Sequence, residues 1–257
     1  MRCTRFLAVA VTLVGCERAD RRRSDEVFVF DGVEPAVGDR TQSSWRFEPH
    51  MLGPDMREHL GRLDFDATSV TTEVIDGRAS AARLEVAHDR HTVDDRPLDR
   101  MSGNYLLRYD ATSTIGSRAD GRPLADHERQ FFEDLTPPLS REERVILRRR
   151  AFRAGERFSP TPLEARLLGF GKLEDKRSIV VTVVAASARE MTFEATYEGL
   201  AKPPAPAIKL SVKSTVSDTV LGGTLDGVWL RDGKQAGSVH GTTRNRFTPA
   251  ATSPRSR

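Results

Sequence analysis

Apolar and polar residues alternate with a period of two over several stretches of the chain. Residues 191–198 read Met-Thr-Phe-Glu-Ala-Thr-Tyr-Glu, and residues 208–213 read Ile-Lys-Leu-Ser-Val-Lys. This alternation is typical of a strand with one buried and one solvated face, because successive side chains of a strand point to opposite faces. The pattern predicts strands over 191–198 and 207–216, and a more buried strand over the β-branched run 179–184.

Asp-Gly pairs mark turns between further strands, since both residues readily take the positive φ of tight hairpin turns. Asp76-Gly77 is predicted to join strands over 69–75 and 80–87, and Asp232-Gly233 to join strands over 221–230 and 235–247. Glycines inside the last two strands predict bulges or sharp bends, and hence a curved sheet or partial barrel. These glycines are Gly222, Gly223, Gly227 and Gly241.

Helix signals gather in the middle of the chain. An apolar face with helical spacing runs over residues 124–135, and Ser140-Arg141-Glu142-Glu143 fits a capping box for a second helix that ends near Arg149. Strands, one or two short helices and strands again predict an α+β fold with a mainly antiparallel, curved β-sheet or partial barrel. We expect a single β-rich domain over 26–247, followed by a disordered tail over 248–257.

Composition narrows the class of protein. The chain has 257 residues, of which 38% are hydrophobic, so it is long enough for a large domain and too apolar for global disorder. Its two cysteines exclude a disulfide-stapled scaffold and a cysteine-rich zinc module. The net charge of +3 balances 40 basic against 37 acidic residues, and the arginines form no single basic stripe. Nucleic acid is not an expected partner either, because the first sixteen residues indicate an exported chain.

The first sixteen residues have the organisation of an export signal. Arg2 and Arg5 precede an uncharged, mostly apolar stretch over residues 6–14. A helix that spans a bilayer needs about 20 apolar residues, so this stretch is too short for a permanent membrane span. It fits the hydrophobic region of a secretory signal peptide, which we place at residues 1–15.

Leu13-Val14-Gly15-Cys16 resembles the lipobox of bacterial lipoproteins. The resemblance implies cleavage between Gly15 and Cys16, lipidation of the Cys16 thiol and acylation of the new N-terminus. An ordinary secretory signal that contains a cysteine is the alternative. Residues 16–25 are expected to form a charged tether, and the membrane becomes a partner through the N-terminal lipid. Glu17 after the cysteine favours the periplasmic face of the outer membrane in a diderm bacterium.

The predicted sheet offers a candidate ligand site. A curved antiparallel sheet with a helix packed against it resembles, in architecture alone, the half-barrels of periplasmic lipoprotein carriers. That resemblance implies that apolar side chains of the C-terminal strands line a concave face that holds an apolar ligand or acyl chain. The candidates are Met191, Phe193, Tyr197, Leu225 and Trp229. The alternative is that these side chains form an ordinary core.

A second candidate site combines imidazoles and carboxylates. His88, His91, Asp94 and Asp95 fall within eight positions and could bind a divalent metal. Their spacing matches no helical metal-binding motif, and on a strand His88 and His91 would point to opposite faces. The alternative is a polar loop after a strand that ends near Ala87.

Residues 141–157 hold seven arginines and three glutamates, which gives a local formal charge of +4. The segment could meet an anionic lipid or an acidic envelope partner, or it could be a solvated helix face. The first functional hypothesis is a non-enzymatic, lipid-anchored envelope protein that binds an apolar ligand. The second is a scaffold lipoprotein that holds an envelope protein, and the third is a metal-dependent envelope hydrolase. No cofactor is predicted.

Overall fold

The computed structural model describes residues 27–30, 32–52, 57–170, 179–199, 207–231 and 234–251. The predicted signal peptide, the lipobox-like segment with Cys16 and the tether lie outside the described residues. The strands are β1 (Val27–Val29), β2 (Arg40–Leu52), β3 (Glu58–Ile75), β4 (Arg78–Val93), β5 (Arg96–Pro97), β6 (Gly103–Tyr109), β7 (Thr114–Arg118), β8 (Ala151–Arg153), β9 (Arg157–Phe158), β10 (Ile179–Ala186), β11 (Glu190–Gly199), β12 (Ala207–Ser217), β13 (Val220–Arg231) and β14 (Lys234–Thr248).

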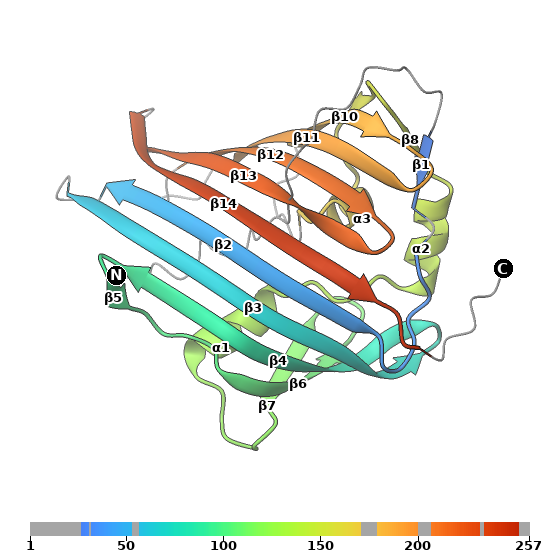
Figure 1. The fold of residues 1–257 in the computed structure, drawn as a ribbon, viewed down its shortest axis with the longest axis horizontal. Coiled ribbons are helices and arrows are strands. Elements are labelled where there is room, and N and C mark those ends of the chain that lie inside the picture. The colour runs from blue at the N-terminus through green and yellow to red at the C-terminus, as the bar shows by residue number, and fades with distance from the viewer. Residues whose placement is uncertain are drawn as a thin grey trace.

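One large antiparallel sheet dominates the molecule (Figure 1). Its twelve strands run in the order β7-β6-β4-β3-β2-β14-β13-β12-β11-β10-β9, with β5 paired to β4, while β1 and β8 form a separate small sheet. The N-terminal and C-terminal halves meet where β14 pairs with β2. The sheet is strongly curved and does not close into a barrel, which confirms the predicted fold class.

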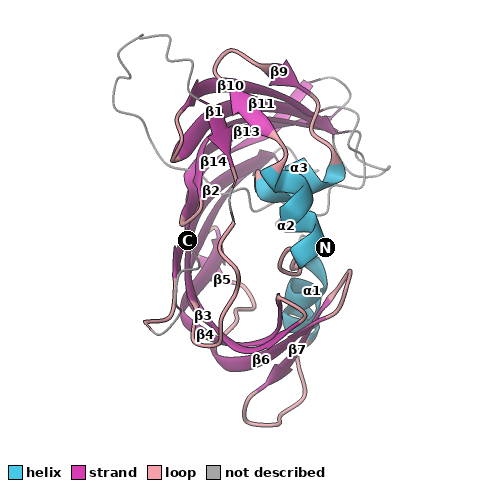
Figure 2. Cartoon of the chain, turned by 90° about the vertical axis from the view of Figure 1, so that its right-hand side faces the viewer, coloured by secondary structure: helices cyan, strands magenta, loops and turns pink. Residues whose placement is uncertain are grey.

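Helices lie across the open, concave side of this sheet (Figure 2). They are α1 (Asp126–Asp134), α2 (Arg141–Arg148) and α3 (Pro162–Leu167). The first two match the predicted helices, and Ser140 caps α2 with the expected capping box. The third was not predicted, because six residues are too few for a helical period. Its start is nevertheless marked in the sequence by Thr161, Pro162 and Glu164, which form a capping box with proline at the first helical position.

The concave face of the sheet is buried, and its convex face is exposed to solvent. Ala195, Val212 and Leu225 are paired neighbours on β11, β12 and β13, and all three are buried. On the opposite face of the same strands, Lys213 and Glu194 form an ion pair at 2.7 Å. This one-sided burial is what the period-two alternation predicted.

Two details of the strands differ from the sequence-based prediction. The strand expected to end near Ala87 continues to Val93, because β3 is long enough to pair with it throughout and a bulge at Ala87 absorbs the change in register. Gly241 serves close packing instead of a bulge: a Cβ there would lie 2.6 Å from the Arg46 carbonyl oxygen and would overlap the Phe47 ring. At the C-terminal end, the Ala250 amide donates to Asp39 over 2.8 Å, so ordered structure extends past 247.

Candidate functional site

The concave face of the C-terminal strands carries the predicted ligand-binding residues. Met191, Phe193 and Tyr197 lie on one face of β11, and Leu225 lies on the same face two strands away. Met191 and Phe193 have no exposed surface, and the Phe170 ring covers Phe193 with its centroid 6.1 Å away. Tyr197 packs half-buried against this core. The structure thus places these four side chains on one face of the sheet, and two of them are fully packed in the core.

Trp229 lies on β13, four residues after Leu225. Its backbone pairs with Ile208 on β12 and with Gly237 on β14, and a register shift follows at Leu230. The Trp229 side chain lies outside the described residues. Its role in ligand binding stays a prediction.

A second apolar group, which sequence analysis did not single out, lies in the N-terminal half. The Trp45 ring stacks on Phe65 of the neighbouring strand at 4.6 Å, and Phe131 of α1 lies 6.2 Å from Trp45 and 5.6 Å from Phe65. The Trp45 indole nitrogen Nε1 is buried and has no hydrogen-bond partner among the described residues. A buried donor without an acceptor is costly, so this N–H could donate to a suitably placed oxygen of a ligand.

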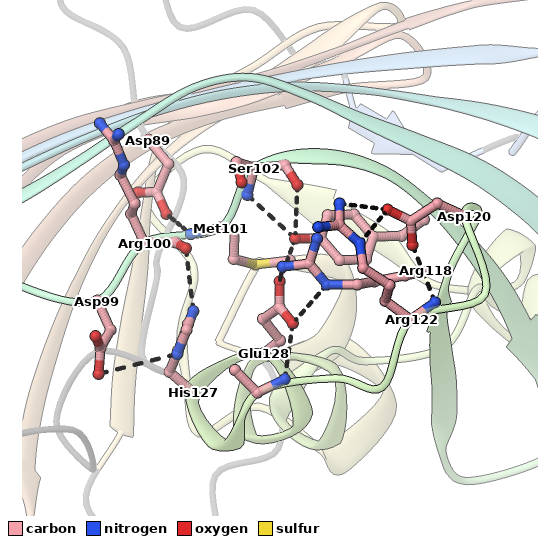
Figure 3. A network of polar contacts seen from close by, with 12 residues as sticks. Asp89, Asp99, Arg100, Met101, Ser102, Arg118, Asp120, Arg122, His127 and Glu128 are labelled. Carbon is pink, nitrogen blue, oxygen red and sulfur yellow. Dashed lines mark hydrogen bonds and ion pairs between the residues drawn. The ribbon is translucent and has the colours of Figure 1, made fainter.

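Glu128 holds α1 against the sheet through a buried polar network (Figure 3). Its carboxylate accepts hydrogen bonds from the Tyr105 hydroxyl at 2.5 Å, from Arg118 Nη2 at 2.5 Å and from the Ala125 amide at 2.9 Å. Tyr105 and Glu128 have no exposed surface. The network joins β6, β7 and the first turn of α1, so it fixes the helix that places Phe131 over Trp45.

The network also shifts the pKa values of its members. Burial disfavours the charged form of Glu128, but the hydrogen bonds from Tyr105, Ala125 and Arg118 outweigh burial and place the pKa of Glu128 below its ordinary value. Burial, together with the adjacent Glu128 carboxylate, raises the pKa of Tyr105 to about 12. Sequence analysis could place Glu128 on a helix, but its partners are 10 and 23 positions away and carry no local signal.

The four predicted metal ligands fall in different surroundings. His88 is exposed on the convex face, whereas His91 lies on the concave face with Nε2 2.9 Å from Asp89 Oδ1. Asp94 and Asp95 form a turn with positive φ. Among the described residues, no three histidine, cysteine, aspartate or glutamate side chains gather in a way that could hold a metal ion.

Asp94 makes a contact of its own. Its carboxylate lies 2.6 Å from His59 Nδ1 and accepts the Leu60 amide at 2.9 Å. The hydrogen bonds from His59 and from the Leu60 amide hold the pKa of Asp94 below its ordinary value. The arrangement ties the turn after β4 to the start of β3.

The arginine-rich segment is divided between the interior and the surface. Arg144 is buried and donates to the carbonyl oxygens of Leu139, at 2.7 Å, and Gly77. Arg150 is bound to Glu156 and Glu164 and stacks on Phe152, with its guanidinium carbon 4.5 Å from the ring centroid. Neither of these two arginines is part of a free cationic surface. Five arginines of the segment are exposed: Arg141, Arg148 and Arg149 lie on α2 or directly after it, Arg153 lies on β8 and Arg157 on β9.

Comparisons with known proteins found no matching family, but they found solved structures of low similarity. No family model and no curated protein matches the chain. A structure of lipid–protein interactions in lipovitellin is similar with a TM-score of 0.38 and 6% sequence identity. The match covers 88% of this chain and 26% of the lipovitellin chain, so this chain spans about a quarter of the length of lipovitellin. DynF from the dynemicin biosynthesis pathway of Micromonospora chersina is similar with a TM-score of 0.20 and 9% identity, over 93% and 95%. Both scores are too low to establish a shared fold.

Within the described residues, no helix is long and apolar enough to cross a membrane. The apolar side chains described above make the concave face of the curved sheet the candidate site. Trp45, Phe65 and Phe131 lie in its N-terminal half. Its C-terminal half carries the predicted ligand-binding residues Met191, Phe193, Tyr197 and Leu225.

Proposed function

We propose that this chain is a lipid-anchored protein of the bacterial cell envelope that binds an apolar ligand on the concave face of its sheet and catalyses no reaction. The observation that carries the ligand proposal is the one-sided, unclosed sheet: apolar side chains of the core line its concave face, and short helices of the described part of the chain lie across that side. A face of this kind is suited to an apolar ligand, since most ligand sites are concave and lined by apolar and aromatic side chains.

The unpartnered Trp45 Nε1 points to the chemistry of the ligand. An acyl chain would contact the Trp45 and Phe65 rings, and a carboxylate or ester oxygen on it would accept the indole hydrogen bond that the described residues leave unmade. Because Phe131 closes over both rings, we expect the ligand to compete with α1 for this surface.

Tryptophan fluorescence tests ligand binding, because the chain has two tryptophans. In the Trp229→Phe variant, Trp45 is the single emitter, and a brominated fatty acid is expected to quench it in a saturable way. Val239→Glu on the concave face should weaken this quenching at least tenfold, whereas Leu106→Glu on the convex face of β6 should leave it unchanged. Linear, non-saturable quenching, or equal binding by both glutamate variants with native circular dichroism, would contradict the proposal.

The anchor is tested separately at Cys16. The wild-type chain should fractionate with membranes and incorporate a radiolabelled fatty acid, since stable attachment needs two or more acyl chains. Cys16→Ser should lose the label and leave the membrane fraction, whereas Cys3→Ser, in the predicted signal peptide, should behave as wild type. Retention of Cys16→Ser in the membrane fraction would show that Cys16 is not the anchor.

A further inference from the structure

Exposed apolar side chains gather around α2. Val145 and Ile146 point outward from the helix, with 39% and 58% of their surfaces exposed. Arg141, Arg148 and Arg149 are also exposed on or directly after α2. An apolar pair flanked by arginines on a helix is the pattern of a surface that rests on a membrane, where aliphatic side chains enter the headgroup boundary and guanidinium groups meet phosphates.

Two neighbouring segments extend this surface. Arg148 donates to the Gly32 carbonyl oxygen at 3.1 Å, which brings Gly32 and the next residue, the exposed Val33, close to the helix. Arg144 donates to the Gly77 carbonyl oxygen and so fixes the tip of the β3–β4 hairpin, where Ile75 is 54% exposed. We call this group the α2 face: Val33, Ile75, Val145 and Ile146.

The described chain begins at the same end of the molecule. Val27 opens β1 and pairs with Arg153 of β8, and β8 follows α2 after two residues. Figure 1 shows β1 and α2 at one end of the sheet. Ten residues separate Cys16 from Val27, and ten residues reach at most about 35 Å when fully extended. A lipid on Cys16 would therefore keep this end of the domain close to the bilayer.

We propose that the α2 face rests on the phospholipid surface to which the chain is anchored; the proposal depends on the lipid anchor proposed above. Glu34, Asp76 and Glu142 lie among the arginines, so the charge attraction is small. Affinity comes from the tether, which holds a weakly binding face at high local concentration against the membrane. The α2 face then sets the orientation of the domain and the direction in which its concave side opens.

A matched pair of isoleucines tests the orientation. Ile146 on α2 and Ile115 on β7 are exposed to similar extents, 58% and 61%. Each is replaced by cysteine in the full chain, which is produced in a bacterium and labelled with an environment-sensitive fluorophore. The lipidated chain would hold no other free thiol, because Cys3 is removed with the signal and Cys16 carries the lipid. The labelled proteins are reconstituted into vesicles of phosphatidylethanolamine and phosphatidylglycerol.

The probe at position 146 is expected to shift its emission to shorter wavelength and to lose at least half of its intensity when the lipids carry brominated acyl chains. The probe at position 115 should show neither change. If the chain floats with the vesicles and both probes respond alike, or neither responds, the proposal that the α2 face rests on the membrane is wrong, while the proposed anchor still stands. A chain that does not float with the vesicles overturns the anchor and the α2 face together.

Discussion

The Tyr105 hydroxyl donates to Glu128 Oε1 over 2.5 Å, and this hydrogen bond joins strand β6, which lies next to the edge strand β7, to helix α1. Neither residue has exposed surface. Arg118, on the edge strand β7, donates to the same carboxylate and neutralises its charge. Because α1 carries Phe131 over Trp45, this carboxylate helps to fix the position of both the helix and Phe131 on the concave face.

Removal of the Glu128 carboxylate should destabilise the fold. In Glu128→Ala, the Tyr105 hydroxyl and the largely buried Arg118 lose their main partner, and we expect the free energy of unfolding to fall by about 3 kcal/mol. Asp126→Ala in the same helix is the control: its side chain is 95% exposed and forms an exposed ion pair with Arg129, so the loss should stay below about 1 kcal/mol. Urea denaturation measures both values, and equal losses would contradict the structural role of Glu128.

Acidification should act on the same carboxylate. The folded-state pKa of Glu128 is lower than its ordinary value, so its contribution to stability is complete above the ordinary value of 4.5 and is lost as the pH falls through the folded pKa. Between pH 6 and acidic pH, the wild type should therefore lose more stability than Glu128→Gln. Urea denaturation across this range checks the difference, and parallel pH profiles would contradict it.

Tyr105 should titrate far above an ordinary tyrosine. Its pKa of about 12 means that the folded state favours the neutral phenol, so this contribution is complete below pH 10 and is lost as the pH rises towards 12. Absorbance at 295 nm follows the ionisation. Glu128→Gln should lower the Tyr105 pKa while leaving it above 10, because burial remains the larger cause. A Tyr105 pKa unchanged by this substitution would show that the carboxylate has no influence.

The pairing of β14 with β2 should depend on Gly241. A methyl group there would overlap the Phe47 ring and lie 2.6 Å from the Arg46 carbonyl oxygen, so we expect Gly241→Ala to cost about 3 kcal/mol through overpacking of the joint between the two halves. Gly155→Ala meets no atom within 4 Å and should cost about 1 kcal/mol for its positive φ. Thermal denaturation that ranks Gly155→Ala as the more harmful change would refute this assignment.

Arg150 should resist replacement by lysine. Its planar guanidinium binds Glu156 and Glu164 while it stacks on Phe152 and Phe158, and an ammonium group cannot make all of these contacts. We expect Arg150→Lys to lower the free energy of unfolding by about 2 kcal/mol. The adjacent, exposed Arg149→Lys should have no measurable effect. Chemical denaturation of the two variants makes the comparison, and similar values would contradict it.

Local patterns in the sequence were enough to predict much of the fold. The alternation over 191–198 predicted both a strand and its buried face, because the period of two is a property of any strand at the surface of a core. Ser140 and Glu143 predicted the start of α2, because a capping box involves residues only three positions apart. The alternation therefore placed Met191, Phe193 and Tyr197 on one side of a strand, and in the structure this is the side that faces the core.

The tertiary structure decided what depends on distant neighbours. The extension of β4 past Ala87 depends on its long partner β3, and Arg118 and Glu128 meet only because β7 and α1 pack together. That Trp45 Nε1 is buried without a hydrogen-bond partner among the described residues also follows from the packing of distant segments. The same holds for Val33, Ile75 and Ile146, which are far apart in the chain and lie exposed around α2. The sequence by itself determined periodicity and local capping, since these depend on residues a few positions apart. Which faces are covered, paired or left exposed depends on packing between distant segments, and the structure alone decided it.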